Sequence, residues 1–443
     1  MSRIFAAGAT LACLLFLSGC VKYQPHVLNP VRTESQFRAR SLEAKPDPES
    51  LTTYAMEFSP EVAVAQAKVA MTEAALITAR QRINPSVSGD GGYNRTPDSV
   101  STYSVSPAFT IETAGKRGYR ILEAEKLAEA SRIAVYETAW QVRSRVRAAL
   151  VNYWAARRRL ALLQSESDVR VEIAGIYEKR VALGAASNPE WNAARADQAA
   201  LAVSLRNAQG EVAQAMAAIA AAAGLPVTAL DGKELDLSTF DNAGAPASLP
   251  LLAVQKAGLL HRADIRRSLI EYESEEARLR LVLANQYPNI TLSPSYAFQE
   301  GFPAYTLGAA LTSLPMLHRN QGPIAEQEAA RRESEARFVA LQAKVVGDTE
   351  LARGQYAAAV TEWNMAKEMV TLQVQREAAV QAAFRAGEND RLDVALARLA
   401  ILAAQRVQAD VLTRAQTALG LLEDAVQSPL APGFPAPRPG TTN

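Results

Sequence analysis

The longest uninterrupted helical pattern in this chain lies between Gly118 and Gly184. About 65 residues follow one another there with no proline and a single internal glycine, Gly175. Apolar residues recur through it in steps of mostly three or four, a spacing typical of helices that wind around one another in a left-handed supercoil. At 1.5 Å per residue such a helix is roughly 100 Å long, so the sequence predicts an elongated helical element. The apolar positions are Ala139, Val142, Val146, Ala149, Tyr153, Ala156, Leu160, Leu163, Ala174, Tyr177 and Val181.

The chain is then predicted to turn back on itself. Gly184 suits the residue that follows a helix, and Ser187 or Asn188, just before a proline, suits the start of the next helix. The next stretch keeps the same apolar spacing and stops at Gly224. Two such helices joined by a tight turn predict an antiparallel helical hairpin over residues 118–224.

A different pattern precedes the long helix. Residues 86–95 and 101–113 alternate polar with small or apolar side chains, and a Thr-Pro-Asp sequence separates them. This pattern predicts a β-hairpin over 86–113. The glycine–lysine pair in Gly115-Lys116-Arg117-Gly118 lacks a GxxxxGK[ST] pattern, so it predicts a strand-to-helix turn rather than a phosphate loop.

The whole arrangement occurs twice. Similar residues recur 203 positions apart in helix, strand and turn, which indicates a duplicated unit. The pairs are Glu61-Val62 with Asp264-Ile265, Pro85 with Pro288, Tyr93 with Tyr296, Tyr153 with Tyr356, and Gly184 with Gly387. We therefore divide the chain into a first repeat, a linker, a second repeat and a flexible tail, at 51–230, 231–250, 251–427 and 428–443. The second repeat would hold a β-hairpin over 289–314 and a long helical hairpin over 322–427.

The predicted strands have the length and pattern of strands that cross a membrane. Apolar residues alternate along the second hairpin, at Ile290, Leu292, Tyr296 and Phe298 and then at Tyr305, Leu307, Ala309 and Leu311. A tilted strand of about ten residues spans a bilayer. Four strands cannot close a barrel without edges, so a pore of this kind requires several copies of the chain.

The N-terminus resembles the export signal of a bacterial lipoprotein. Arg3 precedes an apolar run, which ends in the lipobox-like Leu17-Ser18-Gly19-Cys20. We expect a signal peptide over 1–19, lipidation of Cys20 and an extended, proline-rich segment over 20–50. The alternative is an ordinary signal peptide with an unrelated cysteine. No later run of 18 apolar residues predicts a membrane-spanning helix.

The composition argues against several classes of function. A formal charge of +1 gives no reason to expect nucleic acid, and a 49% apolar fraction with only 6% aromatic residues suits closely packed helices. The arginines of the long helix, at 143, 145, 147 and 157–159, predict solvated helix faces, with an anionic-ligand patch as the alternative.

No catalytic or metal-binding pattern is present in the sequence. The three histidines are isolated from one another and show no nucleophile–base or metal-ligand spacing. They are His26, His261 and His318. We therefore expect no enzyme activity, no cofactor and no metal site.

Taken together, these features resemble the outer-membrane efflux protein family, the TolC-like ducts. The resemblance rests on the lipobox, the duplicated unit and the helix-ending turns Leu183-Gly184 and Ala386-Gly387, and it covers about residues 51–427. Two strand-to-helix junctions, at 113–118 and 314–322, are similar to those of the cobalt–zinc–cadmium efflux branch.

The resemblance implies a fold, a location and partners. It implies a mainly α protein with a small β part, assembled as a trimeric α-barrel of about 100 Å in the periplasm, topped by a twelve-stranded β-barrel in the outer membrane of a Gram-negative bacterium. Such a duct is passive. It receives substrate, here heavy-metal cations, from an inner-membrane pump of the resistance–nodulation–division type through a periplasmic adaptor protein.

The resemblance also implies roles for residues at the helix ends. Leu183-Gly184 and Ala386-Gly387 would contact the adaptor, and Asp390 and Asp393 would constrict the periplasmic entrance. Carboxylates around a threefold axis attract cations and repel anions. The alternative for both acids is a helix start, where the helix dipole favours negative charge.

Two further functional hypotheses stay open at this point. The first is a duct of the same kind for drug efflux or for protein secretion by an ATP-driven pump. The second is a lipid-anchored structural coiled coil of the periplasm, which accounts for the long helices but not for the four strands.

Overall fold

A computed structural model describes residues 23–42, 46–94, 100–243, 258, 260–299, 302–312, 314, 316–430 and 433–437. The chain divides into two units, Met1–Ser41 and Leu42–Asn443. The predicted signal peptide and Cys20 lie outside the described residues.

The first unit contains a helix that we did not predict. Helix α2, Pro30–Arg38, lies within the segment 20–50 that we expected to be extended. Asn29 caps it, because its side chain accepts hydrogen bonds from the amides of Val31 at 3.0 Å and Arg32 at 3.2 Å. Pro30 then occupies the first turn, where its missing N–H costs nothing. Pro30 therefore helps to start a helix within the segment that we expected to be extended.

The second unit is mainly α with a small antiparallel sheet, which confirms the predicted fold class. Its longest helices are α5 and α9, with 67 and 66 residues. Two short 3₁₀ turns, Val227–Ala229 and Ser238–Phe240, follow α6. The helices are α3 (Pro48–Phe58), α4 (Pro60–Arg80), α5 (Lys116–Ala182), α6 (Asn188–Ala223), α8 (Ala263–Ala284), α9 (Gln321–Ala386) and α10 (Arg391–Val426).

The sheet joins the two repeats. Its strands are β1 (Ser86–Asn94), β2 (Val100–Ile111), β3 (Asn289–Gln299) and β4 (Phe302–Thr312), all antiparallel and in the order β1-β2-β3-β4. Each predicted hairpin is therefore present, and β2 pairs with β3 across the repeats. Ser86 and Asn289, which begin β1 and β3, are 203 residues apart, so the structure keeps the spacing found in the sequence.

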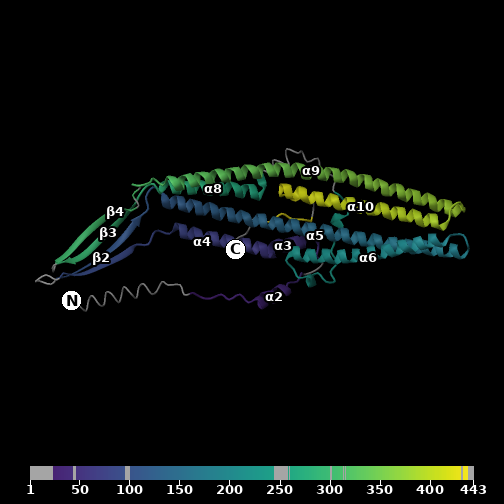
Figure 1. Cartoon of the computed structure of the whole chain (residues 1–443), viewed down its shortest axis with the longest axis horizontal. Coiled ribbons are helices and arrows are strands. Elements are labelled where there is room, and N and C mark those ends of the chain that lie inside the picture. The colour runs from purple at the N-terminus through teal and green to yellow at the C-terminus, as the bar shows by residue number, and fades with distance from the viewer. Residues whose placement is uncertain are drawn as a thin grey trace. The chain divides into compact units, whose positions relative to one another are not determined.

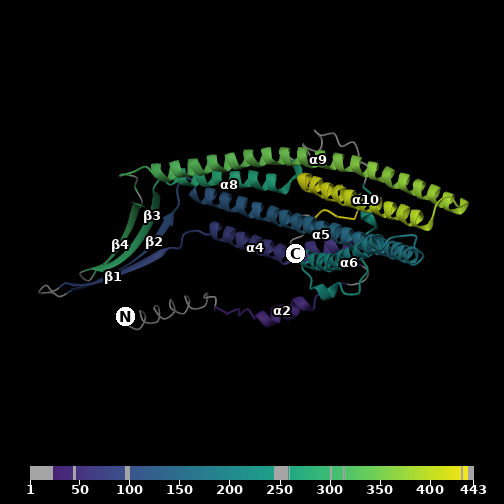
Figure 2. The same cartoon turned by 45° about the vertical axis from the view of Figure 1, so that its right-hand side comes forward.

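Helix α5 is the centre of the bundle. It packs against α3, α4, α6, α8 and α10, and its apolar seam forms the core with α6 at residues such as Val142, Val146, Leu150 and Ile219. Figures 1 and 2 both show the sheet beyond one end of α4, α5, α8 and α9, and the α5–α6 and α9–α10 turns at the other end.

One described segment, Pro48–Arg80, meets the length and composition of a membrane-crossing helix, with a mean hydropathy of 1.3 and 17% of its window buried. We had expected none. In the structure Ser59 separates α3 from α4, and α4 makes polar contacts with α5, such as Thr72 to Ser131 at 2.7 Å. We therefore describe this segment as part of the helical bundle.

Candidate functional site

The sheet has one apolar face and one hydroxyl-rich face. Strand alternation and register place the apolar side chains together, with Tyr103 stacked on Phe298 at 5.2 Å and Tyr296 near Tyr305 at 5.3 Å between ring centroids. That face is formed by Val87, Tyr103, Val105, Pro107, Phe109, Ile111, Ile290, Leu292, Pro294, Tyr296, Phe298, Pro303, Tyr305, Leu307, Ala309 and Leu311. The apolar residues that we predicted on β3 and β4 do share it.

The opposite face carries small and hydroxyl side chains. Ser106 donates to Ser295 at 2.7 Å, and the Thr110 and Thr291 hydroxyls lie 3.4 Å apart, so hydroxyl pairs bridge the two repeats. The described residues of this face are Ser86, Ser88, Asp90, Gly92, Thr102, Ser104, Ser106, Ala108, Thr110, Asn289, Thr291, Ser293, Ser295, Ala297, Phe302, Ala304, Thr306, Gly308, Ala310 and Thr312. An apolar face beside a polar one is the pattern of a strand between lipid and water.

The Gly115-Lys116-Arg117-Gly118 motif fixes the sheet to the bundle. Gly115 has φ +74° and precedes α5, as expected of a strand-to-helix turn. The Lys116 ammonium group donates to the Tyr287 carbonyl at 2.6 Å and to Asn289 Oδ1 at 2.7 Å, and burial lowers its pKa. Arg117 donates to the last carbonyl of α4, that of Arg80, at 2.5 Å. Arg117 therefore satisfies a carbonyl that the end of α4 leaves unpaired, and Lys116 binds the turn between α8 and β3.

The two turns at the far end of the bundle have the same conformation. Gly184 has φ +70° and Gly387 has φ +83°. In each turn the next amide bonds back to a carbonyl five residues earlier, at 2.7 Å and 2.9 Å, which is the Schellman way of ending a helix. Leu183 is 83% exposed, and no atom lies within 4 Å of where a Cβ would stand on either glycine. Both turns leave room for a partner.

Asp390 and Asp393 form the start of α10. Asp390 Oδ1 accepts from the amides of Leu392 at 2.6 Å and Asp393 at 3.2 Å, and Asp393 Oδ2 accepts from the Asp390 amide at 3.0 Å. Asp390 also forms an ion pair with Arg180 at the end of α5. Partial burial raises the pKa of Asp390, but the guanidinium group and the two amides outweigh it and hold the pKa below its ordinary value. The structure therefore assigns both acids the capping role that the sequence left open.

More ion pairs join α10 to α5 along the same half of the bundle. Glu172 pairs with Arg391 at 2.8 Å and with Arg398 at 3.5 Å, and Glu166 pairs with Arg406 at 2.7 Å. Sequence reasoning missed these pairs because the partners are more than 200 residues apart. The spacing of seven and eight residues between the three arginines was the available signal, since it places them on one face of α10.

The arginines of α5 are not all solvated, contrary to our expectation. Arg143 is fully buried and Arg147 is 3% exposed, and both contact Glu423 of α10, at 3.0 Å and 3.3 Å. Arg143 also donates to the Phe434 carbonyl at 3.1 Å, which holds the C-terminal segment against the bundle. The face of α5 that carries Arg143 and Arg147 packs against α10, so these two charges must be paired internally.

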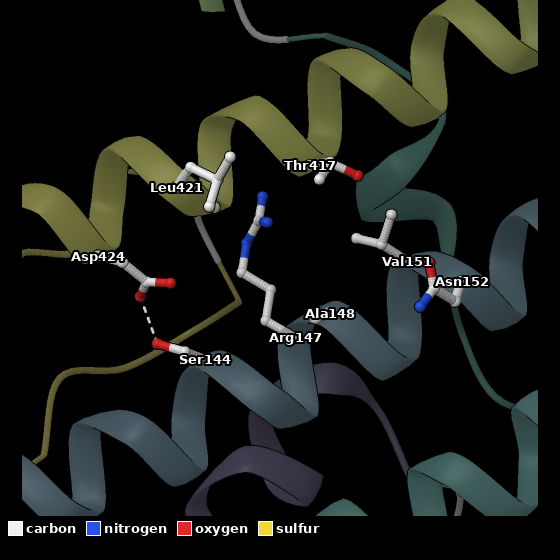
Figure 3. A pocket seen from close by; sticks show the side chains of 9 residues that line it. Ser144, Arg147, Ala148, Val151, Asn152, Thr417, Leu421 and Asp424 are labelled. Atoms are coloured by element: carbon white, nitrogen blue, oxygen red, sulfur yellow. Dashed lines mark hydrogen bonds between the residues drawn. The ribbon is translucent and has the colours of Figure 1, made fainter. Parts of the chain in front are cut away.

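Figure 3 shows Arg147 extending from α5 toward α10, at a small cavity of about 160 Å³. Its Nη1 donates to the Gln416 carbonyl at 2.8 Å. Beside it Asp424 accepts from Trp140 at 3.0 Å and from the Ser144 hydroxyl, and burial raises the pKa of Asp424. These contacts join α5 to α10 inside the bundle, so we assign this cluster to stability.

The part of the chain that the structure describes contains no group of three or more His, Cys, Asp or Glu side chains placed to hold a metal ion.

Comparison with known proteins agrees with this architecture. Residues 52–225 match the family model described as outer membrane efflux protein. The cobalt-zinc-cadmium resistance protein CzcC of Cupriavidus metallidurans is 25% identical over 330 residues, which cover 73% of this chain and 76% of CzcC.

Solved structures show the same fold over both repeats. The outer membrane protein VceC of Vibrio cholerae superposes with a TM-score of 0.69 at 18% identity, over 86% of this chain and 96% of VceC. CusC superposes with a TM-score of 0.70 at 15% identity, over 93% of this chain and 100% of that chain. The matched model covers the first repeat, and the second repeat continues the same fold. Residues 52–225 therefore resemble the outer membrane efflux protein family, and the likeness to VceC and CusC shows that both repeats share the fold of those two proteins.

Proposed function

We propose that three copies of this chain form a passive duct that carries heavy-metal cations across the outer membrane. The observation that carries this proposal is the two-faced sheet. Its strands are 9 to 12 residues long, enough to cross a bilayer when tilted. Strands β1 and β4 each have an unpaired edge in the single chain. Pairing β4 of one copy with β1 of the next would close twelve strands into a barrel without edges.

Exposed apolar stripes on the helices support assembly from several copies. On α9, Leu351, Met365 and Leu372 are spaced by multiples of seven residues and are 61%, 66% and 57% exposed. On α4, Val64 and Met71 are seven residues apart and 70% and 62% exposed. Heptad-spaced apolar residues on an uncovered helix face are the pattern of a coiled-coil contact. A neighbouring copy would cover them.

Heavy-metal cations are the proposed cargo because the relative CzcC is named for cobalt, zinc and cadmium resistance. An inner-membrane resistance–nodulation–division pump would deliver them through a periplasmic adaptor that docks on Leu183-Gly184 and Ala386-Gly387. Asp390 and Asp393 would line the entrance. Drug efflux and protein secretion are the alternative cargoes for the same duct.

We further propose that the chain is exported and lipidated at Cys20, which the sequence Leu17-Ser18-Gly19-Cys20 supports. Labelled palmitate should enter the wild-type protein and not the Cys20→Ser variant. Equal labelling of both proteins would contradict this part of the proposal.

The duct itself is tested by a pair of substitutions on opposite sheet faces. Leu307 lies on the apolar face of β4 and Thr306 on the polar face. A lysine facing lipid near the bilayer centre costs about 2–4 kcal/mol, whereas one facing the lumen is tolerated. We expect wild type and Thr306→Lys to give detergent-stable trimers that conduct in planar bilayers, and Leu307→Lys to give few.

The cargo is tested in cells that lack the gene. Wild type should restore growth on zinc, cobalt or cadmium, and Leu307→Lys should not. A monomer that stays silent in bilayers would favour the structural coiled coil. Trimeric channels that restore growth on drugs but not on metals would support the proposed duct and contradict heavy-metal cations as its cargo.

A further inference from the structure

A single residue carries charge on the sheet. Of all the residues in β1, β2, β3 and β4, Asp90 alone has a side chain that is charged at neutral pH. It lies on the hydroxyl-rich face, paired in register with Ser104. Ser104 Oγ donates to Asp90 Oδ2 at 3.3 Å. The strands offer this carboxylate no basic partner.

A structural reason for aspartate at this position is weak. Aspartate is among the residues that strands disfavour, and an asparagine or serine would accept the same long hydrogen bond from Ser104. The face around Asp90 is already hydrogen-bonded by hydroxyl groups, as in the contact of Ser106 with Ser295 at 2.7 Å. The negative charge is the property that neutral side chains cannot supply.

We propose that Asp90 sets the cation preference of the membrane part of the duct. This proposal rests on the proposed function, because it needs the hydroxyl-rich face to line a water-filled lumen. Three copies would then place three carboxylates in a lumen that the strands otherwise line with neutral groups. A charge beside a low-dielectric wall raises the local concentration of counter-ions. The neutral hydroxyl groups of the lining would bind metal cations only weakly. Weak binding is needed if the cations are to leave the lumen at the outer side.

The local potential is measured by cysteine reactivity rather than by conductance, because the entrance at Asp390 and Asp393 would contribute to any current. Ser88 lies two residues from Asp90 on the same strand and face. We compare rates at which cationic and anionic methanethiosulfonate reagents, added from outside, modify Ser88→Cys in the reconstituted full-length protein. Modification is read on the peptide that contains residue 88.

Removal of the charge should lower the ratio of cationic to anionic rates. For a unit charge about 7 Å away, Coulomb's law in water gives about a sevenfold change at very low salt and about a twofold change at 0.15 M ionic strength. We expect these decreases in Asp90→Asn, and a reversed preference in Asp90→Lys. Asp90→Ser replaces Asp90→Asn if the latter fails to assemble. Glu211→Gln, which removes one exposed charge from α6, should leave the ratio unchanged. An unchanged ratio in Asp90→Asn, or an equal change in Glu211→Gln, would overturn the proposal.

A second cysteine separates failure of this inference from failure of the proposed function. Val105 lies on the apolar face, so Val105→Cys should resist both reagents. If Val105→Cys reacts and Ser88→Cys does not, the hydroxyl-rich face does not line the lumen. That result would contradict the proposed duct as well as the role of Asp90. If only Ser88→Cys reacts, and its ratio of cationic to anionic rates is the same with and without the Asp90 charge, the proposed duct is supported and Asp90 has no role in selectivity.

Discussion

At the scale of single residues, the contact between Arg147 and Gly420 has the most specific energetic consequence. A Cβ on Gly420 would stand 2.4 Å from Arg147 Nη1, which is closer than real contacts allow. Arg147 cannot easily move away, because Gln416 and Glu423 hold its guanidinium group in a buried site. The glycine is therefore required by a charge on the neighbouring helix, and not by its own backbone.

We predict that Gly420→Ala destabilises the folded protein by about 1–3 kcal/mol, the usual cost of overpacking a buried contact. Gly354 is the matched control. It lies inside α9 with no atom within 4 Å of a built Cβ, so Gly354→Ala should stabilise by about 0.5–1 kcal/mol. Urea unfolding of the purified variants measures both. Equal stabilisation by the two alanines would show that Arg147 yields to the methyl group.

Asp390 gives a pH prediction. Its pKa in the folded chain lies below the ordinary aspartate value, so its contribution to stability is present above the unfolded pKa of about 3.9 and is lost as pH falls through the folded pKa. Hydrogen exchange at the start of α10 should therefore accelerate on acidification below about pH 4.

Two variants divide the Asp390 contribution. Asparagine caps helices well, so Asp390→Asn should lose only the half-exposed pair with Arg180, at most about 1 kcal/mol. Asp390→Ala should lose the cap as well, about 1–2 kcal/mol in all. Both should flatten the acid-dependent part of the exchange. A wild-type pH profile in Asp390→Asn would exclude Asp390 as the titrating group.

At the scale of elements, substitutions at Gly184 and Gly387 can distinguish an effect on stability from an effect on adaptor docking. A side chain at Gly184 or Gly387 must adopt positive φ, at a cost of roughly 1–2 kcal/mol, yet space around both positions is open. We predict that Gly184→Trp and Gly387→Trp form normal trimers but sensitise cells to the metal. Crosslinking of the adaptor to the turns should fall with resistance. Wild-type resistance and crosslinking in both variants would place the docking site elsewhere.

The elements show how far local sequence signals extend. The glycines at 184 and 387 do end their helices in the left-handed conformation, as predicted, because a helix end is specified by residues adjacent in sequence. The faces of β3 and β4 were also predictable, since strand alternation has a fixed period. Helix α2 departs from the extended segment that the prolines predict, because Asn29-Pro30 is a helix start signal.

The long-range contacts were not predictable from the sequence. Arg143 and Arg147 were expected in solvent, because arginine is seldom buried without a partner. Their partner, Glu423, lies about 280 residues further along, and nothing in the local pattern of α5 identifies it. The functional assignments of the turns and of Asp390 and Asp393 came from family resemblance, and they stay predictions.

At the scale of the whole molecule, duplication explains why one chain supplies two hairpins to the sheet and two long hairpins to the bundle. The repeats have diverged where they meet the sheet. Arg117 donates to the Arg80 carbonyl at the end of α4 in the first repeat, whereas Asn320 donates to the Val282 carbonyl in the last turn of α8 at 2.9 Å in the second. The same end of a helix is thus satisfied by a charged group in one repeat and by an amide in the other.

The pairing of β2 with β3 also affects the order of folding. Ser106 and Ser295 bond across 189 residues, whereas α5 and α6 are neighbours in sequence and can pair as soon as both are made. At 5–20 residues per second, the first β-hairpin is synthesised roughly 10–40 s before its partner strand exists. Its apolar face and free edge are open to aggregation during that interval. The first hairpin therefore exists without its partner for longer than the second hairpin does, because the β2–β3 pair cannot form until both strands have been made.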